Sequence, residues 1–262
     1  MVTAETKKAK VRADQLVLDL GMAPTRENAR ALIISGVNFL GEQRVDKPGT
    51  RLPAGSALEI RGAVSPFVSR GGLKLEGALD GFKLDVAGLS CLDVGASTGG
   101  FTHCLLLRGA ARVIAVDVGY GQLHQKLRED PRVTVMERVN ARYLEKENLP
   151  YAPDLVTVDA SFISLRLILP AVLRAAPGAR VIALVKPQFE AGRGKVGKGG
   201  VVRDEEVRRR LVSEVADFAV SLGYTEAGMV PSPIKGPKGN REFFLFLEPS
   251  GPHRASGDER EK

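Results

Sequence analysis

A turn of small residues between two apolar strands is the part of the chain best suited to binding a ligand. The apolar run at residues 89–94 leads into the sequence Gly-Ala-Ser-Thr-Gly-Gly at residues 95–100, where a helix can begin. Side chains this small let backbone N–H groups approach a bound molecule closely. The next strand, residues 112–117, ends at Asp117, and an acid in that place typically accepts hydrogen bonds from a ribose. The pattern predicts a cofactor that contains a nucleoside.

Two classes of cofactor compete for this turn. The dinucleotide fingerprint G-x-G-x-x-G requires a middle glycine, and this chain has Ser97 there. Asp93 precedes the turn, and its charge would repel a pyrophosphate but suit a cationic ligand. S-adenosylmethionine carries a sulfonium and an ammonium and no phosphate, so the methyl donor is favoured over NAD. The predicted cofactor-binding residues are Asp93, Gly95, Ala96, Ser97, Thr98, Gly99, Gly100, Phe101, Asp117, Val118, Asn140 and Asp159.

Individual roles follow from position along the chain. Asp93 should face the methionine end of the cofactor, and Asp117 should hold its ribose. Asn140 follows the third strand and either flanks the adenine or serves as an ordinary cap of a turn.

Four charged residues are expected at one edge of a parallel sheet. Asp159 and Lys186 close the apolar strands 154–159 and 180–186. A lysine that ends an apolar strand needs acidic partners. An Asp at a strand end has a second interpretation, because it often caps the following helix. If the last strand is antiparallel, it begins at the edge where the parallel strands finish, which would bring Glu242 beside Lys186. With Lys74 from the helix before the first strand, the four are expected to converge over the methyl donor.

The remaining elements form an alternating series. Strands are expected at residues 89–94, 112–117, 132–136, 154–159, 180–186, 225–231 and 242–247. Helices are expected at residues 71–82, 99–108, 121–129, 164–176 and 203–222. This alternation predicts a doubly wound α/β sheet with its ligand crevice at the carboxyl ends of the strands.

A smaller unit precedes this sheet. Residues 12–20 and 26–34 have helical spacing, with Thr25 as the cap of the second helix. Short extended pieces follow at residues 37–40, 43–45 and 57–60, separated by Pro-Gly turns. The order resembles an S4 domain, a family that binds structured RNA. Cations of this unit and of the later loops are the expected RNA contacts: Arg12, Arg26, Arg30, Arg44, Lys47, Arg51, Arg70, Arg193, Lys195 and Lys198.

The larger unit resembles the FtsJ/RrmJ-like RNA 2′-O-ribose methyltransferases, which use a Lys-Asp-Lys-Glu tetrad in this chain order. Lys74, Asp159, Lys186 and Glu242 match that tetrad one by one. Together with the S4-like unit, stretches such as Ser-Arg-Gly-Gly-x-Lys-Leu and Val-Lys-Pro-Gln-Phe-Glu resemble the TlyA family, some members of which carry the label hemolysin A. The resemblance implies a Rossmann-like, seven-stranded class I methyltransferase with a small N-terminal α+β S4 domain.

The same resemblance implies an enzyme that methylates cytidine ribose in ribosomal RNA of the large and, in some members, the small subunit. Lys186 would act as base or steer the hydroxyl, and Asp159 would orient it. Lys74 and Glu242 would position the hydroxyl and its neighbouring phosphate. The same chemistry on another structured RNA, or a non-catalytic ribosome-assembly factor, are the alternatives.

The implied organisation is a disordered segment at residues 1–10, an S4 domain at 11–61 and a linker at 62–70. The methyltransferase domain follows at 71–249 and a disordered tail at 250–262. The Gly-rich segment 192–199 resembles a P-loop but has Gly199 where Ser or Thr should bind magnesium, so an RNA-gripping loop is the expected role.

Composition supports a soluble enzyme of the cytoplasm with a polyanionic partner. The chain has 38 basic and 31 acidic residues, a net charge of +7 and a pI near 9.5. Cys91 and Cys104 fall in apolar surroundings and are expected in the core, not in a disulfide. The three histidines share no ligand spacing, so no metal is expected. Apolar runs are too short for a membrane span, which argues against a pore-forming role for the hemolysin label.

Overall fold

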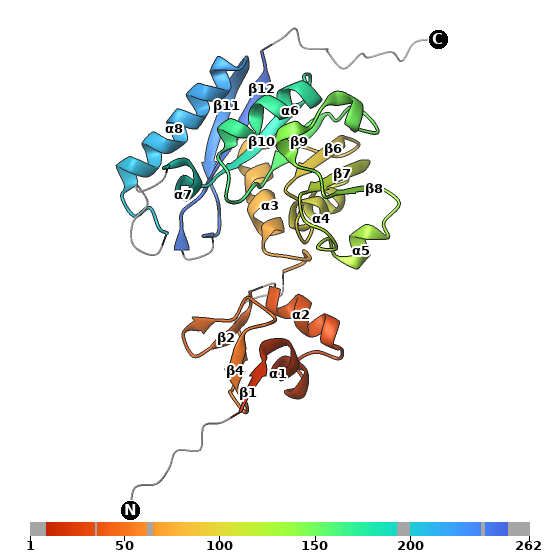
Figure 1. Cartoon of the computed structure of the whole chain (residues 1–262), viewed down its shortest axis with the longest axis vertical. Helices are drawn as coiled ribbons and strands as arrows, with labels where there is room; N and C mark the ends of the chain where they lie inside the picture. The colour runs from red at the N-terminus through yellow and green to blue at the C-terminus, as the bar shows by residue number, and fades with distance from the viewer. Residues whose placement is uncertain (1–8, 35, 62–64, 193–199, 237–238, 251–262) are drawn as a thin grey trace, which may run out of the picture.

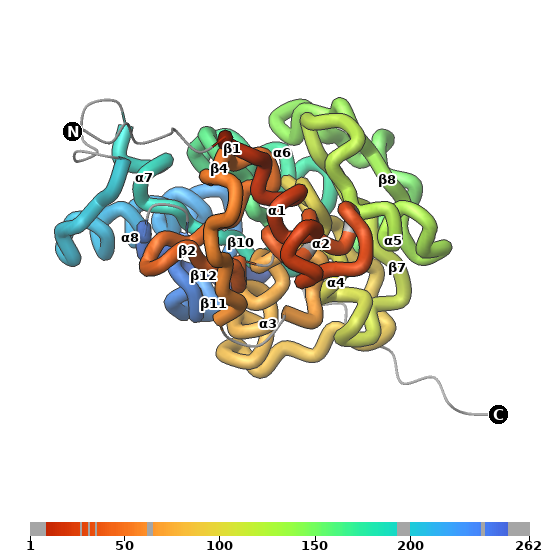
Figure 2. Tube along the Cα trace, turned by 90° about the horizontal axis from the view of Figure 1, so that it is seen from below, coloured from red at the N-terminus to blue at the C-terminus, as the bar shows by residue number. Residues whose placement is uncertain are grey.

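The computed structural model describes residues 9–34, 36–61, 65–192, 200–236 and 239–250 of the 262-residue chain. These residues form a small N-terminal part and a larger part built on one sheet (Figure 1). Viewed from below, the N-terminal part overlies the larger one (Figure 2).

The sheet of the larger part has seven strands in the order β11-β12-β10-β9-β6-β7-β8. Five of them, from β10 through β8 in that order, run parallel, and β12 runs antiparallel to both β10 and β11. Their bounds are β6 (Ser90–Val94), β7 (Arg112–Asp117), β8 (Val133–Glu137), β9 (Leu155–Val158), β10 (Arg180–Val185), β11 (Tyr224–Pro231) and β12 (Phe243–Pro249). The antiparallel last strand therefore begins at the edge where β9 and β10 end, as expected.

Helices cover both faces of this sheet. They are α3 (Gly71–Phe82), α4 (Gly100–Leu107), α5 (Gln125–Arg128), α6 (Leu169–Ala175), α7 (Pro187–Glu190) and α8 (Glu205–Ser221), with short 3-10 helices η1 (Ala141–Tyr143), η2 (Lys146–Asn148) and η3 (Leu165–Leu167). Because successive side chains of a strand point to opposite faces, Val94 packs in the core under α6 and α8, whereas Cys91 packs in the core under α3 and α4. Cys91 and Cys104 are free and buried, as predicted.

The N-terminal part contains α1 (Ala13–Asp19), α2 (Arg26–Ile34) and two small sheets. One sheet pairs β1 (Lys10–Arg12) with β4 (Arg51–Pro53), and the other has the order β3 (Gln43–Arg44), β2 (Asn38–Leu40), β5 (Glu59–Ile60). Its own core includes Leu16, Val17, Ile33 and Leu52. This part therefore has an apolar core separate from the two cores of the sheet.

The predicted elements agree with the structure apart from the following differences. Residues 164–176 do not form one helix, because the chain turns as η3 and restarts as α6 with Pro170 in its first turn. Only Gln125–Arg128 of the helix expected at 121–129 is helical. The strands β1 and β4 were missed, since β4 ends at Pro53, which indicates a turn; proline is tolerated there because the strand lies at a sheet edge.

Candidate active site

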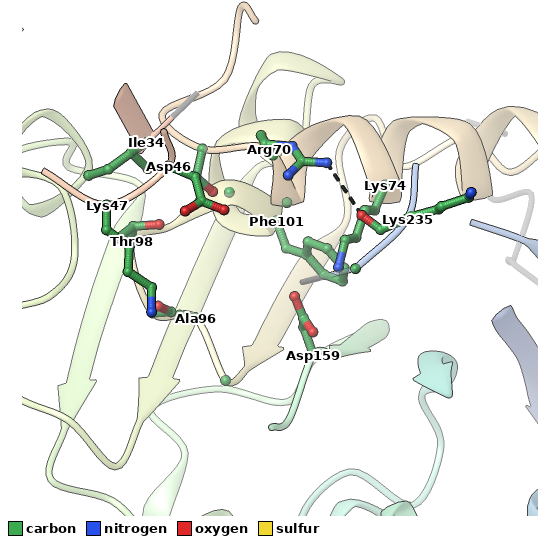
Figure 3. A pocket seen from close by; sticks show the side chains of 16 residues that line it. Ile34, Asp46, Lys47, Arg70, Lys74, Ala96, Thr98, Phe101, Asp159 and Lys235 are labelled. Carbon is green, nitrogen blue, oxygen red and sulfur yellow. Dashed lines mark hydrogen bonds between the residues drawn. The ribbon is translucent and has the colours of Figure 1, made fainter. Parts of the chain in front are cut away.

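The turn after β6 forms one wall of a cavity between the two parts of the chain. This cavity has a volume of about 290 Å³ and is lined by Lys74 and Asp159 from the larger part and by Asp46 and Lys47 from the N-terminal part (Figure 3). Ala96, Ser97, Thr98, Gly100 and Phe101 of the turn and of α4 also line it. Two charged residues of the N-terminal part therefore stand at the predicted site.

A second cavity, of about 570 Å³, lies on the other side of the same turn. Predicted cofactor residues line it: Gly95, Ser97, Asp117, Val118, Asn140 and Asp159. Gly95, Ser97 and Asp159 also line the first cavity. The two cavities thus adjoin at the turn, with Asp159 facing both.

Backbone geometry explains why the turn needs small residues. Gly95 has a φ of 86°, and a Cβ built there would lie 2.7 Å from the carbonyl oxygen of Asp159. The turn is held from the neighbouring strand by the Asp117 carboxylate, which accepts hydrogen bonds from Ser97 N–H at 2.8 Å and Gly119 N–H at 2.7 Å. Any side chain at position 95 would therefore fill the space beside the turn, which we call the cradle at Gly95. Without a side chain, this space allows a ligand such as a nucleoside to approach the backbone closely.

The four residues of the predicted tetrad form two ion pairs. Lys74 Nζ lies 2.6 Å from Glu242 Oε2, and Lys186 Nζ lies 2.6 Å from Asp159 Oδ1. Lys186 Nζ also donates a hydrogen bond to Ser161 Oγ at 2.7 Å. Lys74, Lys186 and Glu242 are all buried. The sequence predicted Glu242 beside Lys186, but the salt-bridge partner of Glu242 is Lys74, because α3 brings that lysine to the start of β12.

Glu242 keeps one acceptor free within the described part of the chain. Its Oε1 atom is buried and has no hydrogen-bond partner there. Gly236 leaves room for this carboxylate, since a Cβ at that position would lie 2.0 Å from Oε1. A buried acceptor without a donor costs free energy, so the site is suited to a ligand that brings a donor.

Asp93 was predicted to face the cofactor, but its side chain does not line the cofactor cavity. Its side chain is fully buried, and its carboxylate accepts hydrogen bonds from the hydroxyls of Thr102 at 2.7 Å and Thr157 at 3.0 Å. Burial raises the pKa of Asp93 to about 7. The reason is the pleat of β6: residue 93 shares the face of Cys91, which is covered by α4. Asp93 therefore supports the turn from below.

Two other predicted cofactor residues have structural roles. Gly99, with a φ of 94°, does not line either cavity, and its Cα hydrogens face Leu123 and Leu127. Asn140 lines the second cavity and also caps η1, accepting a hydrogen bond from Arg142 N–H at 3.1 Å. Both functions predicted for Asn140 are therefore compatible with its position.

The predicted RNA-binding cations fall into four groups. Arg12 and Arg26 pair with the buried Asp14 at 2.9 Å and 3.3 Å, and the hydrogen bond from Arg12 is the main cause that lowers the pKa of Asp14. Arg30, Arg44 and Arg51 are exposed, while Lys47 and Arg70 line the first cavity. Arg193, Lys195 and Lys198, and with them the predicted RNA-gripping loop, lie outside the described residues.

Arg70 joins the linker region to the site. Its guanidinium donates a hydrogen bond to the Lys235 carbonyl oxygen at 3.3 Å (Figure 3). Burial, followed by the charge of Arg44, lowers the pKa of Arg70. The cation therefore lies between the N-terminal part and the loop that precedes Glu242.

Two residues that shape the site were not predicted from the sequence. Ser161 is the second partner of Lys186, and Asp14 fixes two of the predicted RNA-binding arginines. The motif Val-Asp-Ala-Ser-Phe-Ile-Ser contains Ser161 two positions after Asp159, which is a usable signal. Pairing through Asp14 has no such signal, because it depends on how α1 and α2 pack.

The described residues contain neither a cluster of metal ligands nor a membrane-spanning helix. No group of three or more His, Cys, Asp or Glu residues is arranged to hold a metal ion there. None of the helices described is both long and apolar enough to cross a membrane.

Known proteins resemble this chain over most of its length. Residues 67–248 match the family model of the FtsJ-like methyltransferases. The 16S/23S rRNA (cytidine-2′-O)-methyltransferase TlyA of Mycobacterium tuberculosis is 48% identical over 240 residues, covering 91% of this chain and 90% of that protein. Hemolysin A of Brachyspira hyodysenteriae is 38% identical over 239 residues, covering 90% of this chain and 99% of that protein.

A solved structure agrees with these relatives. A provisionally named hemolysin from Streptococcus thermophilus superimposes with a TM-score of 0.74 at 44% identity, covering 92% of this chain and 89% of the other. The family match, the seven-stranded sheet with its antiparallel last strand and the Lys-Asp-Lys-Glu order all agree. The chain therefore belongs to the TlyA family of FtsJ-like methyltransferases.

Proposed function

We propose that the protein is an S-adenosylmethionine-dependent methyltransferase that modifies the ribose 2′-OH of cytidine in ribosomal RNA. The observation that carries the proposal is Lys186, which is buried and bound by Asp159 and Ser161. The backbone of Asp159 in turn lies against Gly95 in the turn after β6. The rRNA target comes from the name of the M. tuberculosis relative, a 16S/23S rRNA (cytidine-2′-O)-methyltransferase.

The cavity beyond Ser97 is the proposed cofactor site. Asp117 borders it and would receive the ribose hydroxyls, and Asn140 would lie beside the adenine. S-adenosylmethionine, when bound, supplies an electrophilic methyl group. Gly95 leaves the space that the ligand needs, and Asp93 supports the turn through Thr102 and Thr157.

The proposed acceptor site is the cavity between the two parts of the chain. A ribose hydroxyl is a poor nucleophile at neutral pH, so its proton must be removed or the hydroxyl must be aligned very well. Lys186 would receive that proton or steer the hydroxyl, and Asp159 and Ser161 would hold the lysine side chain in place. Glu242 Oε1, buried without a donor among the described residues, would accept a hydrogen bond from the substrate while Lys74 neutralises its charge.

The N-terminal part, residues 11–61, is proposed as an S4 domain that binds the RNA. Its exposed cations Arg30 and Arg44, and the pair fixed by Asp14, are of the type that contacts phosphates. Replacing Arg30 and Arg44 by Ala should weaken RNA binding and lower its dependence on salt concentration by about one unit of slope for each lost phosphate contact. Unchanged affinity and slope would remove these residues from the interface.

The chemical proposal is tested by transfer of a labelled methyl group to ribosomal subunits that lack the modification. Wild-type protein should transfer label, and Lys186→Ala should not. Lys146→Ala is the matched control, because Lys146 is exposed on η2 and lines neither cavity. Cofactor and RNA binding by wild-type protein with no transfer would favour the alternatives, a different structured RNA or a non-catalytic assembly factor.

A further inference from the structure

Glu190, at the end of α7, is a buried carboxylate behind the candidate active site. Only 9% of the residue is exposed, and burial raises its pKa. Its Oε2 atom accepts a hydrogen bond from Ser164 Oγ at 2.5 Å, and its Oε1 atom accepts one from Leu165 N–H at 2.9 Å. Both oxygens are therefore used to hold the chain that follows β9.

No cation neutralises Glu190 by direct contact among the described residues. The nearby Arg166 forms its ion pair with Glu214 instead, at 2.8 Å. A carboxylate that is buried with only uncharged donors is costly to keep. The burial of the Glu190 carboxylate is therefore not explained by a salt bridge.

The segment that Glu190 holds is the loop that carries Asp159 and Ser161. Between these residues and Ser164 the backbone passes through Phe162, whose φ is 65°. A bulky residue keeps a positive φ only when its surroundings fix it. The loop therefore needs anchors on both sides of Phe162.

The structure contains such anchors between this loop and the segment that begins at Lys186. Lys186 contacts Asp159 and Ser161 at one end of the loop, and Glu190 binds Ser164 and Leu165 at the other. Lys186 is the N-cap of α7 and Glu190 is its last residue, so both ends of the loop are tied to one short helical segment.

We propose that Glu190 is a positioning residue for methyl transfer, which fixes the loop so that Asp159 and Ser161 meet Lys186. The inference rests on the proposed function and adds a residue that touches neither substrate nor cofactor. Small displacements of a catalytic group, of about 1 Å, can lower a rate by about 10²-fold. Because Asp159 and Ser161 also line the proposed cofactor cavity, loss of the anchor should weaken cofactor binding as well, but should lower the rate by a larger factor.

Glu190→Ala and Glu190→Gln separate a positioning role from general support of the fold. Alanine removes both hydrogen bonds, and kcat should fall by about 10²-fold. Cofactor Kd should rise by less than about tenfold, and RNA Kd should not change. Glutamine can still accept from Leu165 N–H and can donate to Ser164 Oγ, so kcat should recover to within about fivefold of wild type. Glu214→Ala removes an exposed carboxylate that also reaches η3 through Arg166 and should leave kcat unchanged.

Ser164→Ala is a milder second variant that removes only the bond to Oε2. It should lower kcat by about fivefold to tenfold, and the double variant with Glu190→Ala should be no slower than Glu190→Ala alone, since both changes break the same link. This variant decides the question if Glu190→Ala does not fold, and a wild-type kcat for Ser164→Ala would then overturn the proposal.

Other results would also overturn it. If the Glu190→Ala protein folds and keeps the wild-type kcat, the hydrogen bonds of Glu190 are not needed for positioning. A Glu190→Gln protein as slow as Glu190→Ala, or a rate loss matched by an equal loss of cofactor affinity, would indicate a structural role only. If wild-type protein itself transfers no methyl group to ribose, the proposed function fails first, and the two failures are thereby distinguished.

Discussion

Removal of one member of the buried Lys74–Glu242 pair should destabilise the protein more than replacement of both. Lys74 Nζ lies 2.6 Å from Glu242 Oε2, and the two side chains are 10% and 0% exposed. A charge left without its partner in such surroundings costs about 3–5 kcal/mol, whereas apolar replacement of both partners is often neutral. We therefore expect Lys74→Met and Glu242→Leu each to lower the free energy of unfolding by about 3–5 kcal/mol. The double variant should lose much less than the sum.

Urea unfolding of the full-length protein near neutral pH measures these free energies. Glu214→Ala is the matched control, because its partner Arg166 lies at a similar distance of 2.8 Å but the two side chains are 44% and 37% exposed. An exposed pair contributes about 0–1 kcal/mol, so the control should change stability by no more than that. Single variants of the buried pair that behave like the control, or a double variant that loses the full sum, would refute the reasoning.

Three other substitutions test separate parts of the site. Lys186→Ala should lower the rate of methyl transfer by about 10²–10⁴-fold with cofactor affinity unchanged in calorimetry; a rate near wild type would exclude Lys186 as the proton acceptor. Gly95→Ala should weaken S-adenosylmethionine binding by about tenfold or more, because its Cβ would lie 2.7 Å from the Asp159 carbonyl oxygen at a φ of 86°; an unchanged Kd would contradict the proposed cradle. Burial raises the pKa of Asp93 from 3.8 to about 7, so the folded protein keeps a proton that the unfolded chain releases. Its contribution to stability should fall by up to about 4 kcal/mol as the pH rises from about 4 to about 7. In urea titrations across that range the Asp93→Asn variant should lack this fall, and parallel curves for both proteins would show that Asp93 does not titrate as described.

The catalytic half of the fold could be predicted from the sequence because β7, β9 and β10 are apolar runs, each with a polar residue at or directly after its end. Asp159 and Lys186 mark the ends of β9 and β10, and the antiparallel β12 places Glu242 at the same edge. Which acid pairs with which lysine was not predictable. That choice depends on the path of α3, which brings Lys74 to Glu242 and leaves Lys186 for Asp159.

The direction in which a side chain points was the second property that could not be predicted from the sequence. The role of Asp93 was wrong because a strand buried on both faces shows no alternation that tells which face a polar residue occupies. The two hydroxyls that satisfy it, on Thr102 and Thr157, come from α4 and β9. The roles of Asp14 and Glu190 could not be predicted either, because their partners come from elsewhere in the chain. Asp14 pairs with Arg26 of the neighbouring helix, and Glu190 accepts a hydrogen bond from Leu165 N–H.

The most direct test of the central claim is to locate the methyl group on the RNA. Unmodified ribosomal subunits are incubated with the protein and labelled S-adenosylmethionine, then digested and analysed by mass spectrometry. The account predicts label on the 2′-oxygen of a cytidine ribose, and none with Lys186→Ala. Label on a base would keep the cofactor site but contradict the role given to Lys186, Asp159 and Glu242.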